Sequence, residues 1–210
     1  DDLRRLVKGS KAAFRRERLE EPLERYLDEF ENWQGVFEEI FEASVDLTRL
    51  DELAFRKLLP EMRHLEAFRY LAGPPISADD LKTVAEVASI APGRLESSPE
   101  ILDKLVAVVV TGLDRRRFEW VREQREASPT ERAAAILASA SLLAAQRVQT
   151  WRRTSAKRVQ EGQTIEVLVE CGFKSVAKRP IYAVRDAPQP GEYCSESTVV
   201  GHKADIIVGL

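Results

Sequence analysis

The sequence has few cysteines and no long apolar run. Its two cysteines, Cys171 and Cys194, lack CxxC spacing, so we expect free thiols and neither a disulfide framework nor a zinc site. The most apolar stretches, residues 102–110 and 133–145, are shorter than the roughly 20 residues that a membrane-spanning helix needs. No secretory signal is recognisable. We therefore expect a soluble, cytoplasmic protein.

Common phosphate-binding and nucleophile motifs are also missing. Neither GxGxxG nor GxxxxGK[S/T] occurs, and Ser195 and Ser197 lack a nucleophile elbow. His64 and His202 are too isolated in the sequence to form a metal pair. The chain does have 44% hydrophobic and 32% charged residues over its 210 positions, which is enough to bury a core.

The net charge of −3 conceals an asymmetry along the chain. Residues 1–100 contain 15 Lys+Arg against 22 Asp+Glu, whereas residues 101–210 contain 17 against 13. The basic excess is greatest over residues 147–185, with nine Lys+Arg and three acids. This segment suits a polyanionic partner, although a solvated helix face without any partner explains the charge equally well.

The first three quarters of the chain are predicted to be helical. Ser77 is placed to cap one helix, and Ser128 with Glu131 forms a capping box at the start of another, which we expect to run beyond Ala145. Gly172 is placed as the residue that ends this helix. An apolar stripe that we interpret as core packing comprises Phe30, Trp33, Phe37, Ile40 and Phe41.

The character of the sequence changes after Gly172. Residues 178–184 are predicted to form a short strand, followed by a Pro/Gly loop through Pro188, Pro190 and Gly191. Residues 204–208 are rich in β-branched side chains and predict a buried strand. The order of elements is therefore helix, loop and strand, in a protein that is mainly α.

Two carboxylates stand out from this pattern. Asp205 lies at the head of an apolar strand, where burying an unpaired charge is costly and a metal ion would relieve the cost. A strand end that faces water, or a pair with Lys203, explains Asp205 without a metal. Glu161 shares a helix face with four other residues: Ile165, Leu168, Val169 and Gly172. It is either a side chain that reaches solvent from a helix end or an active-site group at the edge of the core.

A set of short motifs carries a family resemblance over residues 147–210. They are RVQEGQ (158–163), Glu166 with Leu168, CGF (171–173), PGEYCSES (190–197) and GHKADIIVGL (201–210). In this order they resemble the XamI-type family of type II restriction endonucleases, within the PD-(D/E)xK nuclease superfamily. The resemblance implies a multi-helix region over residues 1–146. Residues 147–210 would then form the first helix and strands of an α/β restriction-endonuclease-like core.

The same resemblance implies an enzyme and its partners. It implies Mg²⁺-dependent hydrolysis of phosphodiester bonds in double-stranded DNA at a short specific sequence. Asp205 would be the metal ligand, Glu161 the carboxylate from the preceding helix, and Glu196, in the family's GEYCxES-like loop, a further catalytic candidate without an assigned role. Phosphate contacts are expected from Arg152, Arg153, Lys157, Arg158 and Lys203. A palindromic target would call for a homodimer.

The sequence departs from the superfamily pattern at one point. The (D/E)xK half-motif belongs on the strand after Asp205, and no such strand precedes Leu210. Lys203 cannot replace it by motif, because it comes before Asp205. We therefore expect the chain to be truncated after the first catalytic Asp, and these 210 residues alone not to cleave DNA. Two alternatives remain open: a helical protein-interaction module and a DNA-binding module without catalysis.

Overall fold

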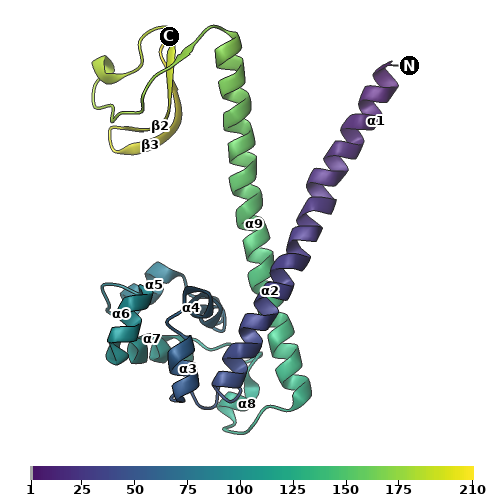
Figure 1. Cartoon of the computed structure of the whole chain (residues 1–210), viewed down its shortest axis with the longest axis vertical. Helices are drawn as coiled ribbons and strands as arrows, with labels where there is room; N and C mark the ends of the chain where they lie inside the picture. The colour runs from purple at the N-terminus through teal and green to yellow at the C-terminus, as the bar shows by residue number, and fades with distance from the viewer. Residues whose placement is uncertain (1) are drawn as a thin grey trace. The chain divides into compact units, whose positions relative to one another are not determined.

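The computed structural model describes residues 2–210, with side chains from residue 9 onward. The chain divides into two compact units, residues 1–149 and 150–210, and the long helix α9 (Pro129–Glu170) contributes to both (Figure 1). Helices dominate, and a small three-stranded sheet follows α9, which confirms the predicted fold class. The assignment of residues 1–146 and 147–210 as domains stays a prediction. Within the described residues, no helix is long and apolar enough to cross a membrane.

The first unit begins with one continuous helix in three stretches. These are α1 (Asp2–Arg15), the π-helical turn η1 (Arg16–Glu20) and α2 (Glu21–Ala43), coloured purple to blue in Figure 1. Pro22 lacks an N–H group, and its ring crowds the preceding turn of an ordinary α-helix. The wider π turn, in which the Glu21 N–H donates to the Arg16 carbonyl, accommodates it. The helix therefore passes Pro22 without ending.

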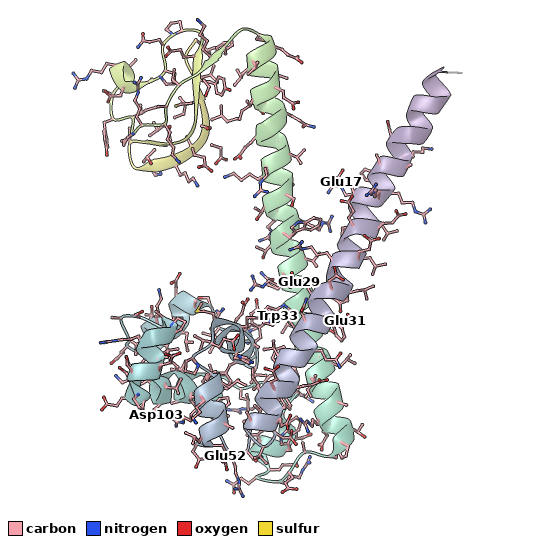
Figure 2. All side chains as sticks on the ribbon, in the orientation of Figure 1. Glu17, Glu29, Glu31, Trp33, Glu52 and Asp103 are labelled. Carbon is pink, nitrogen blue, oxygen red and sulfur yellow. The ribbon has the colours of Figure 1, made fainter. Side chains whose placement is uncertain are left out.

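The apolar stripe predicted within residues 30–41 lies where α2 meets the core. Trp33, Phe37, Ile40 and Phe41 are buried, and Phe30 packs against them while partly exposed, so this prediction is confirmed. The Trp33 indole donates a hydrogen bond to Glu29 at 3.0 Å (Figure 2).

The other helices of the unit are α3 (Leu53–Leu58), α4 (Met62–Arg69), α5 (Ala78–Val84), α6 (Pro92–Ser97), α7 (Pro99–Thr111) and α8 (Glu119–Arg122).

Both predicted helix caps are present in this unit. The Ser77 hydroxyl accepts a hydrogen bond from the Asp80 N–H at 3.0 Å. At the start of α9, the Ser128 N–H donates to the Glu131 carboxylate at 2.9 Å, and the Glu131 N–H donates to the Ser128 hydroxyl at 3.3 Å. These bonds satisfy N–H groups that a helix start leaves without partners.

Arg117 joins three segments of the helical unit through its guanidinium group. It donates to the Asp114 carboxylate at 2.8 Å, to the buried Ser139 hydroxyl of α9 at 3.0 Å, and to the carbonyls of Tyr70 and Ala72 at 2.9 and 3.0 Å. Its side chain is only 13% exposed, so these hydrogen bonds replace most of its hydration. The network fixes the loop after α4 against α9.

In the second unit, α9 ends as predicted at Gly172. This residue has φ 86°, its N–H donates to the Val169 carbonyl, and the Phe173 N–H donates to the Leu168 carbonyl. The pair of bonds is a Schellman motif, which needs the left-handed conformation that glycine adopts without strain. Gly172 thereby turns the chain out of the helix and toward the sheet.

The sheet contains β1 (Lys174–Ser175), β2 (Glu192–Val199) and β3 (His202–Val208), in that spatial order. The short strand β1 pairs with β2 in parallel, and β2 pairs with β3 in antiparallel register, for example Cys194 with Ile207. Val200 and Gly201 have φ 46° and 84° and make the two-residue turn between β2 and β3. The 3₁₀ turn η2 (Val184–Asp186) lies in the loop before β2.

Two expectations for this region are wrong. The GEYCSES segment, expected as a loop, forms most of strand β2. Residues 178–184, expected as a strand, contain only one isolated bridge, between Ile181 and Val199. The predicted strand 204–208 is present, but none of its residues is buried as expected, and it begins earlier, at His202, so Asp205 lies in the middle of β3 rather than at its head.

Candidate functional site

Three charged side chains from distant parts of the sequence meet in the second unit. The Lys157 ammonium lies 2.5 Å from the Asp205 carboxylate and 3.5 Å from the Glu161 carboxylate. Lys157 and Glu161 are one turn apart on α9, and Asp205 comes from β3. We call these three residues the Lys157 cluster. It brings together the two carboxylates that the sequence singled out independently.

The cluster is open to solvent on one side. The side chains of Lys157 and Asp205 are about half exposed, at 50% and 51%, whereas that of Glu161 is 27% exposed. The hydrogen bond with Asp205 raises the pKa of the Lys157 ammonium above its ordinary value, and the nearby Glu161 adds to this effect. Lys157 is therefore protonated and positively charged where it lies between the two carboxylates.

Glu161 has one oxygen that is not fully satisfied. Its Oε1 atom is buried and makes no hydrogen bond, although the Lys157 ammonium is 3.5 Å away. The predicted face is present in part: Glu161, Ile165 and Leu168 are half-buried, whereas Val169 is 55% exposed and Gly172 is also exposed. A partly buried carboxylate oxygen without a donor is suited to a cation.

The expectation that Asp205 would be a buried, unpaired charge is wrong. Its side chain is exposed rather than buried, so no burial cost calls for a metal ion. The pairing considered with Lys203 is not the one observed, because Lys157 is the partner of Asp205. The interest of Asp205 comes instead from its place beside Lys157 and Glu161.

Glu196 lies in the middle of β2 and outside the Lys157 cluster. The register pairs Ser195 with Ile206 and Ser197 with Ala204, which places Glu196 across from Asp205. Its carboxylate, however, pairs with the Lys178 ammonium at 3.6 Å. Glu196 has φ 50°, a left-handed conformation that is strained for a residue with a side chain. Its catalytic role stays a prediction.

The predicted phosphate-binding residues are all exposed. Arg152, Arg153 and Arg158 lie on α9, and Lys203 lies on β3. Among the described residues, none of these four has an acidic partner within ion-pair distance, whereas Lys157 has two. DNA contact by these four cations stays a prediction. Lys157, in contrast, belongs to the carboxylate cluster. The i,i+4 spacing of Lys157 and Glu161 was a signal in the sequence for that pairing.

His64 and a surface groove belong to the helical unit. His64 is buried, with Nε2 2.7 Å from the Glu39 carboxylate and Nδ1 3.0 Å from that of Glu61, so it is a packed histidine.

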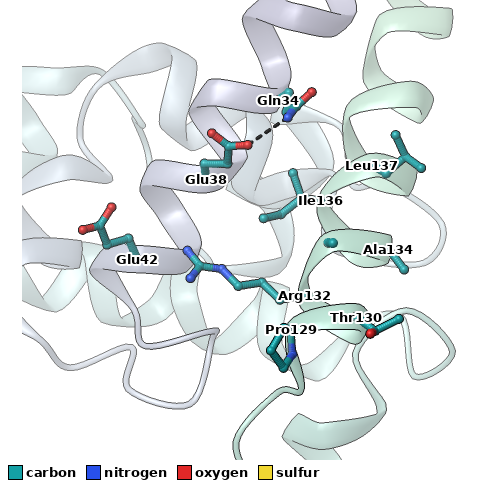
Figure 3. Close-up of a pocket in the computed structure, with 10 residues that line it drawn as sticks. Gln34, Glu38, Glu42, Pro129, Thr130, Arg132, Ala134, Ile136 and Leu137 are labelled. Carbon is teal, nitrogen blue, oxygen red and sulfur yellow. Dashed lines mark hydrogen bonds between the residues drawn. The ribbon is translucent and has the colours of Figure 1, made fainter.

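A groove of about 760 Å³ lies between α2 and the start of α9 (Figure 3). Gln34 donates to Glu38 on its α2 wall, and the α9 wall includes Leu137. No predicted site residue lines this groove.

The Lys157 cluster has donors that suit a hard divalent cation. Mg²⁺ binds through one or two carboxylates and completes its shell with waters and substrate phosphate oxygens. Asp205 and Glu161 provide two such carboxylates, one with an unsatisfied buried oxygen. No group of three or more His, Cys, Asp or Glu side chains within the described part of the chain could hold a metal ion. The donor set therefore fits an open, substrate-assisted site and not a closed structural one.

Similarity to known proteins extends over most of the chain. The family model for the XamI restriction endonuclease matches residues 48–210. The type II restriction enzyme XamI from Xanthomonas campestris pv. amaranthicola is 38% identical over 204 residues, which cover 96% of this chain and 73% of that enzyme. No solved structure matches. Neither match supports the alternatives of an interaction module or a non-catalytic DNA-binding module. The predicted resemblance and the predicted class of type II restriction enzyme are confirmed: the chain belongs to the XamI restriction endonuclease family.

Proposed function

We propose that the chain contributes the metal-binding and DNA-binding residues of a type II site-specific deoxyribonuclease in the cytoplasm. This enzyme would hydrolyse phosphodiester bonds in double-stranded DNA at a short sequence, in a Mg²⁺-dependent reaction. The observation that carries this proposal is the Lys157 cluster, because it places two carboxylates and a lysine at one open site next to a basic helix. Family membership supplies the reaction class, and the cluster supplies the residues.

Asp205 and Glu161 are the residues that would hold the metal ion. A bound Mg²⁺ activates water and neutralises charge on the scissile phosphate. Asp205 is exposed enough to reach a shared ligand, and Glu161 is held by the half-buried face of α9. The Lys157 ammonium balances both carboxylates in this structure, and its positive charge is available to a phosphate oxygen when DNA is bound.

The DNA backbone would be held by the exposed cations around the cluster. Arg152, Arg153 and Arg158 lie on the same helix as Lys157, and Lys203 precedes Asp205 on β3. Phosphate contacts of this kind set affinity and register without reading the sequence. A homodimer is part of the proposal, because two copies related by a two-fold axis match a palindromic site.

Metal binding tests the two carboxylates directly. Calorimetric titration with Mn²⁺, a probe for the Mg²⁺ site, should show at least a tenfold loss of affinity in Asp205→Asn and in Glu161→Gln, since even outer-shell partners of a metal account for about 10- to 100-fold. Glu166→Gln is the matched control, because Glu166 is exposed on the same helix and outside the cluster. Lys157→Gln should bind Mn²⁺ more tightly, because it removes the cation that competes for both carboxylates.

Cleavage provides the second measurement. In a form of the enzyme that cleaves DNA, Asp205→Asn should reduce Mg²⁺-dependent cleavage more than about 100-fold. Loss of an outer-shell partner of a metal already reduces activity by up to about 100-fold, and loss of a direct ligand should reduce it further. DNA affinity measured in EDTA should stay close to that of the parent, because Asp205 contributes no phosphate contact. Parental Mn²⁺ affinity together with parental cleavage in Asp205→Asn would show that the site assignment is wrong.

A further inference from the structure

The first helix carries an exposed apolar stripe that the proposed nuclease site does not use. The stripe consists of Phe14, Leu19, Leu23 and Leu27, which are 63, 57, 53 and 50% exposed. The three leucines are four residues apart, so they follow one face of the helix from η1 into α2. Phe14 is five residues before Leu19, and the π turn η1, with its i→i+5 bonding, brings residues five apart into line. The wide turn at Pro22 therefore extends the stripe into α1.

This part of the helix has no support from the rest of its unit. Every residue from 9 to 20 is exposed, and α1 is followed directly by the π turn. A single helix in water is only marginally stable, and most helices in proteins are stabilised by packing an apolar face. An exposed stripe along such a helix is typical of a surface that is covered by a partner helix.

The charges beside the stripe change sign at its centre. Residues 3–18 contain seven Lys+Arg and one acid, whereas residues 20–31 contain six acids and one Arg. Leu19 separates the two halves. A helix with a basic first half and an acidic second half repels a parallel copy of itself and attracts an antiparallel one. The stripe and the charges therefore specify the same partner.

Most ion pairs within the helix use charges near the change of sign, and Arg25 pairs with Glu29 at 3.6 Å within the acidic half. Arg15 pairs with Glu20 at 3.3 Å, and Arg16 pairs with Glu21 at 3.1 Å. Further out, Lys11, Glu24 and Glu31 have no ion pair among the described residues; Figure 2 shows Glu17, Glu29 and Glu31 along this helix. These outer charges remain available to a second helix.

We propose that a second copy of this chain docks antiparallel on α1, η1 and α2 and covers the exposed stripe. A two-fold axis between Leu19 and Leu23 places these leucines opposite one another, and it places Lys11 of each copy opposite Glu31 of the other. Such an interface uses the same surface on both copies, as cyclic dimers do. This inference rests on the proposed homodimer and names the surface through which the two copies bind. Its test measures only molecular mass, so a negative result would reject this interface without rejecting the proposed nuclease activity.

Charge reversal in one half of the helix provides the sharpest test. In the first variant, four basic residues become glutamate: Lys11, Arg15, Arg16 and Arg18. In the second variant, four acidic residues become lysine: Glu20, Glu21, Glu24 and Glu31. Light scattering after gel filtration should show a dimer for the parent, a monomer for each variant alone, and a heterodimer for their equal mixture. Recovery in the mixture shows that both variants still fold.

Two further variants separate the stripe from general surface charge. The double change Leu19→Gln with Leu23→Gln should raise the dimer dissociation constant at least about 100-fold, because it removes buried apolar surface from both copies. Arg94→Glu with Glu96→Lys, on the exposed surface of α6, should leave the dimer intact. A monomeric parent, a dimer that survives both charge reversals, or a mixture that stays monomeric would each overturn the proposal.

Discussion

The two units of the chain differ in what they bury. The helical unit has six fully buried aromatic side chains: Phe37, Phe41, Phe55, Phe68, Phe118 and Trp120. In the second unit, the large apolar side chains that are buried, among the described residues, are Ile181 and Tyr193, and the smaller Cys194 and Pro188 are buried with them. Burial of apolar surface is the main favourable term in folding, so the helical unit holds most of the stability. The second unit instead presents its charges to solvent, where substrate can reach them.

The difference extends to how charges are used. In the helical unit, Arg117 is almost fully enclosed and donates to carbonyls and to Asp114. In the second unit, Lys157 and Asp205 form an ion pair that is half exposed. An enclosed charge with satisfied donors fixes structure, whereas an exposed pair can exchange partners at low cost. The comparison predicts large stability effects in the first unit and functional effects in the second.

The largest stability effect is expected from Phe68→Ala in the helical unit. Phe68 is 1% exposed, and its ring lies 5.4 Å from that of Phe55 in an edge arrangement. Its removal should lower the free energy of unfolding by about 3–5 kcal/mol, through lost burial and the cavity that remains. Urea unfolding followed by circular dichroism measures this loss. Leu53→Ala, at a 66% exposed position, should stay within about 0.5 kcal/mol of the parent. Equal losses for the two variants would contradict the comparison.

A smaller effect, with a distinct pH dependence, is expected from Asp114→Asn. Burial raises the pKa of the Asp114 carboxyl, but hydrogen bonds from Arg117 and from two backbone N–H groups outweigh it and lower the pKa below its ordinary value. The charged form therefore stabilises the fold above the ordinary pKa of 3.8, and this contribution disappears as the pH falls through the lowered value.

The expected loss for Asp114→Asn is about 1.5–3 kcal/mol at pH 7, the usual contribution of hydrogen bonds to a charged group. The gap between the variant and the parent should narrow steadily as the pH falls below 4, as measured by thermal unfolding. Asp51→Asn, at an exposed position, should match the parent throughout. A gap that is constant from pH 7 to pH 3 would show that the carboxylate charge does not act through Arg117.

The sequence predicted local features better than contacts between distant segments. The caps at Ser77 and Ser128 and the helix end at Gly172 each depend on a few neighbouring residues, and all three are present. The contact between Lys157 and Asp205 depends on how β3 packs against α9, 48 positions away in the sequence. No local pattern encodes that approach, so Lys157 was expected only to bind phosphate.

Strand β2 was missed for a different reason. A half-buried strand normally alternates between inward and outward side chains. Here Tyr193 and Cys194 are both buried, Ser195 and Glu196 are both exposed, and Ser197 is buried again. The left-handed conformation of Glu196 interrupts the pleat, so the segment lacks the period of two that identifies a strand. Its proline and glycine neighbours then favoured a loop.

The smallest expected effect concerns the exposed cations of the second unit. If Arg152 and Arg158 contact DNA phosphates, replacing each by Gln should reduce the slope of log affinity against log salt by about one. Fluorescence anisotropy with duplex DNA, in EDTA and over a range of salt, measures this slope without cleavage. Arg94→Gln is the matched control, because it removes the same charge from an exposed position of the helical unit. An equal change of slope for all three variants would mean that the net charge of the protein, and not these two arginines of α9, determines DNA affinity.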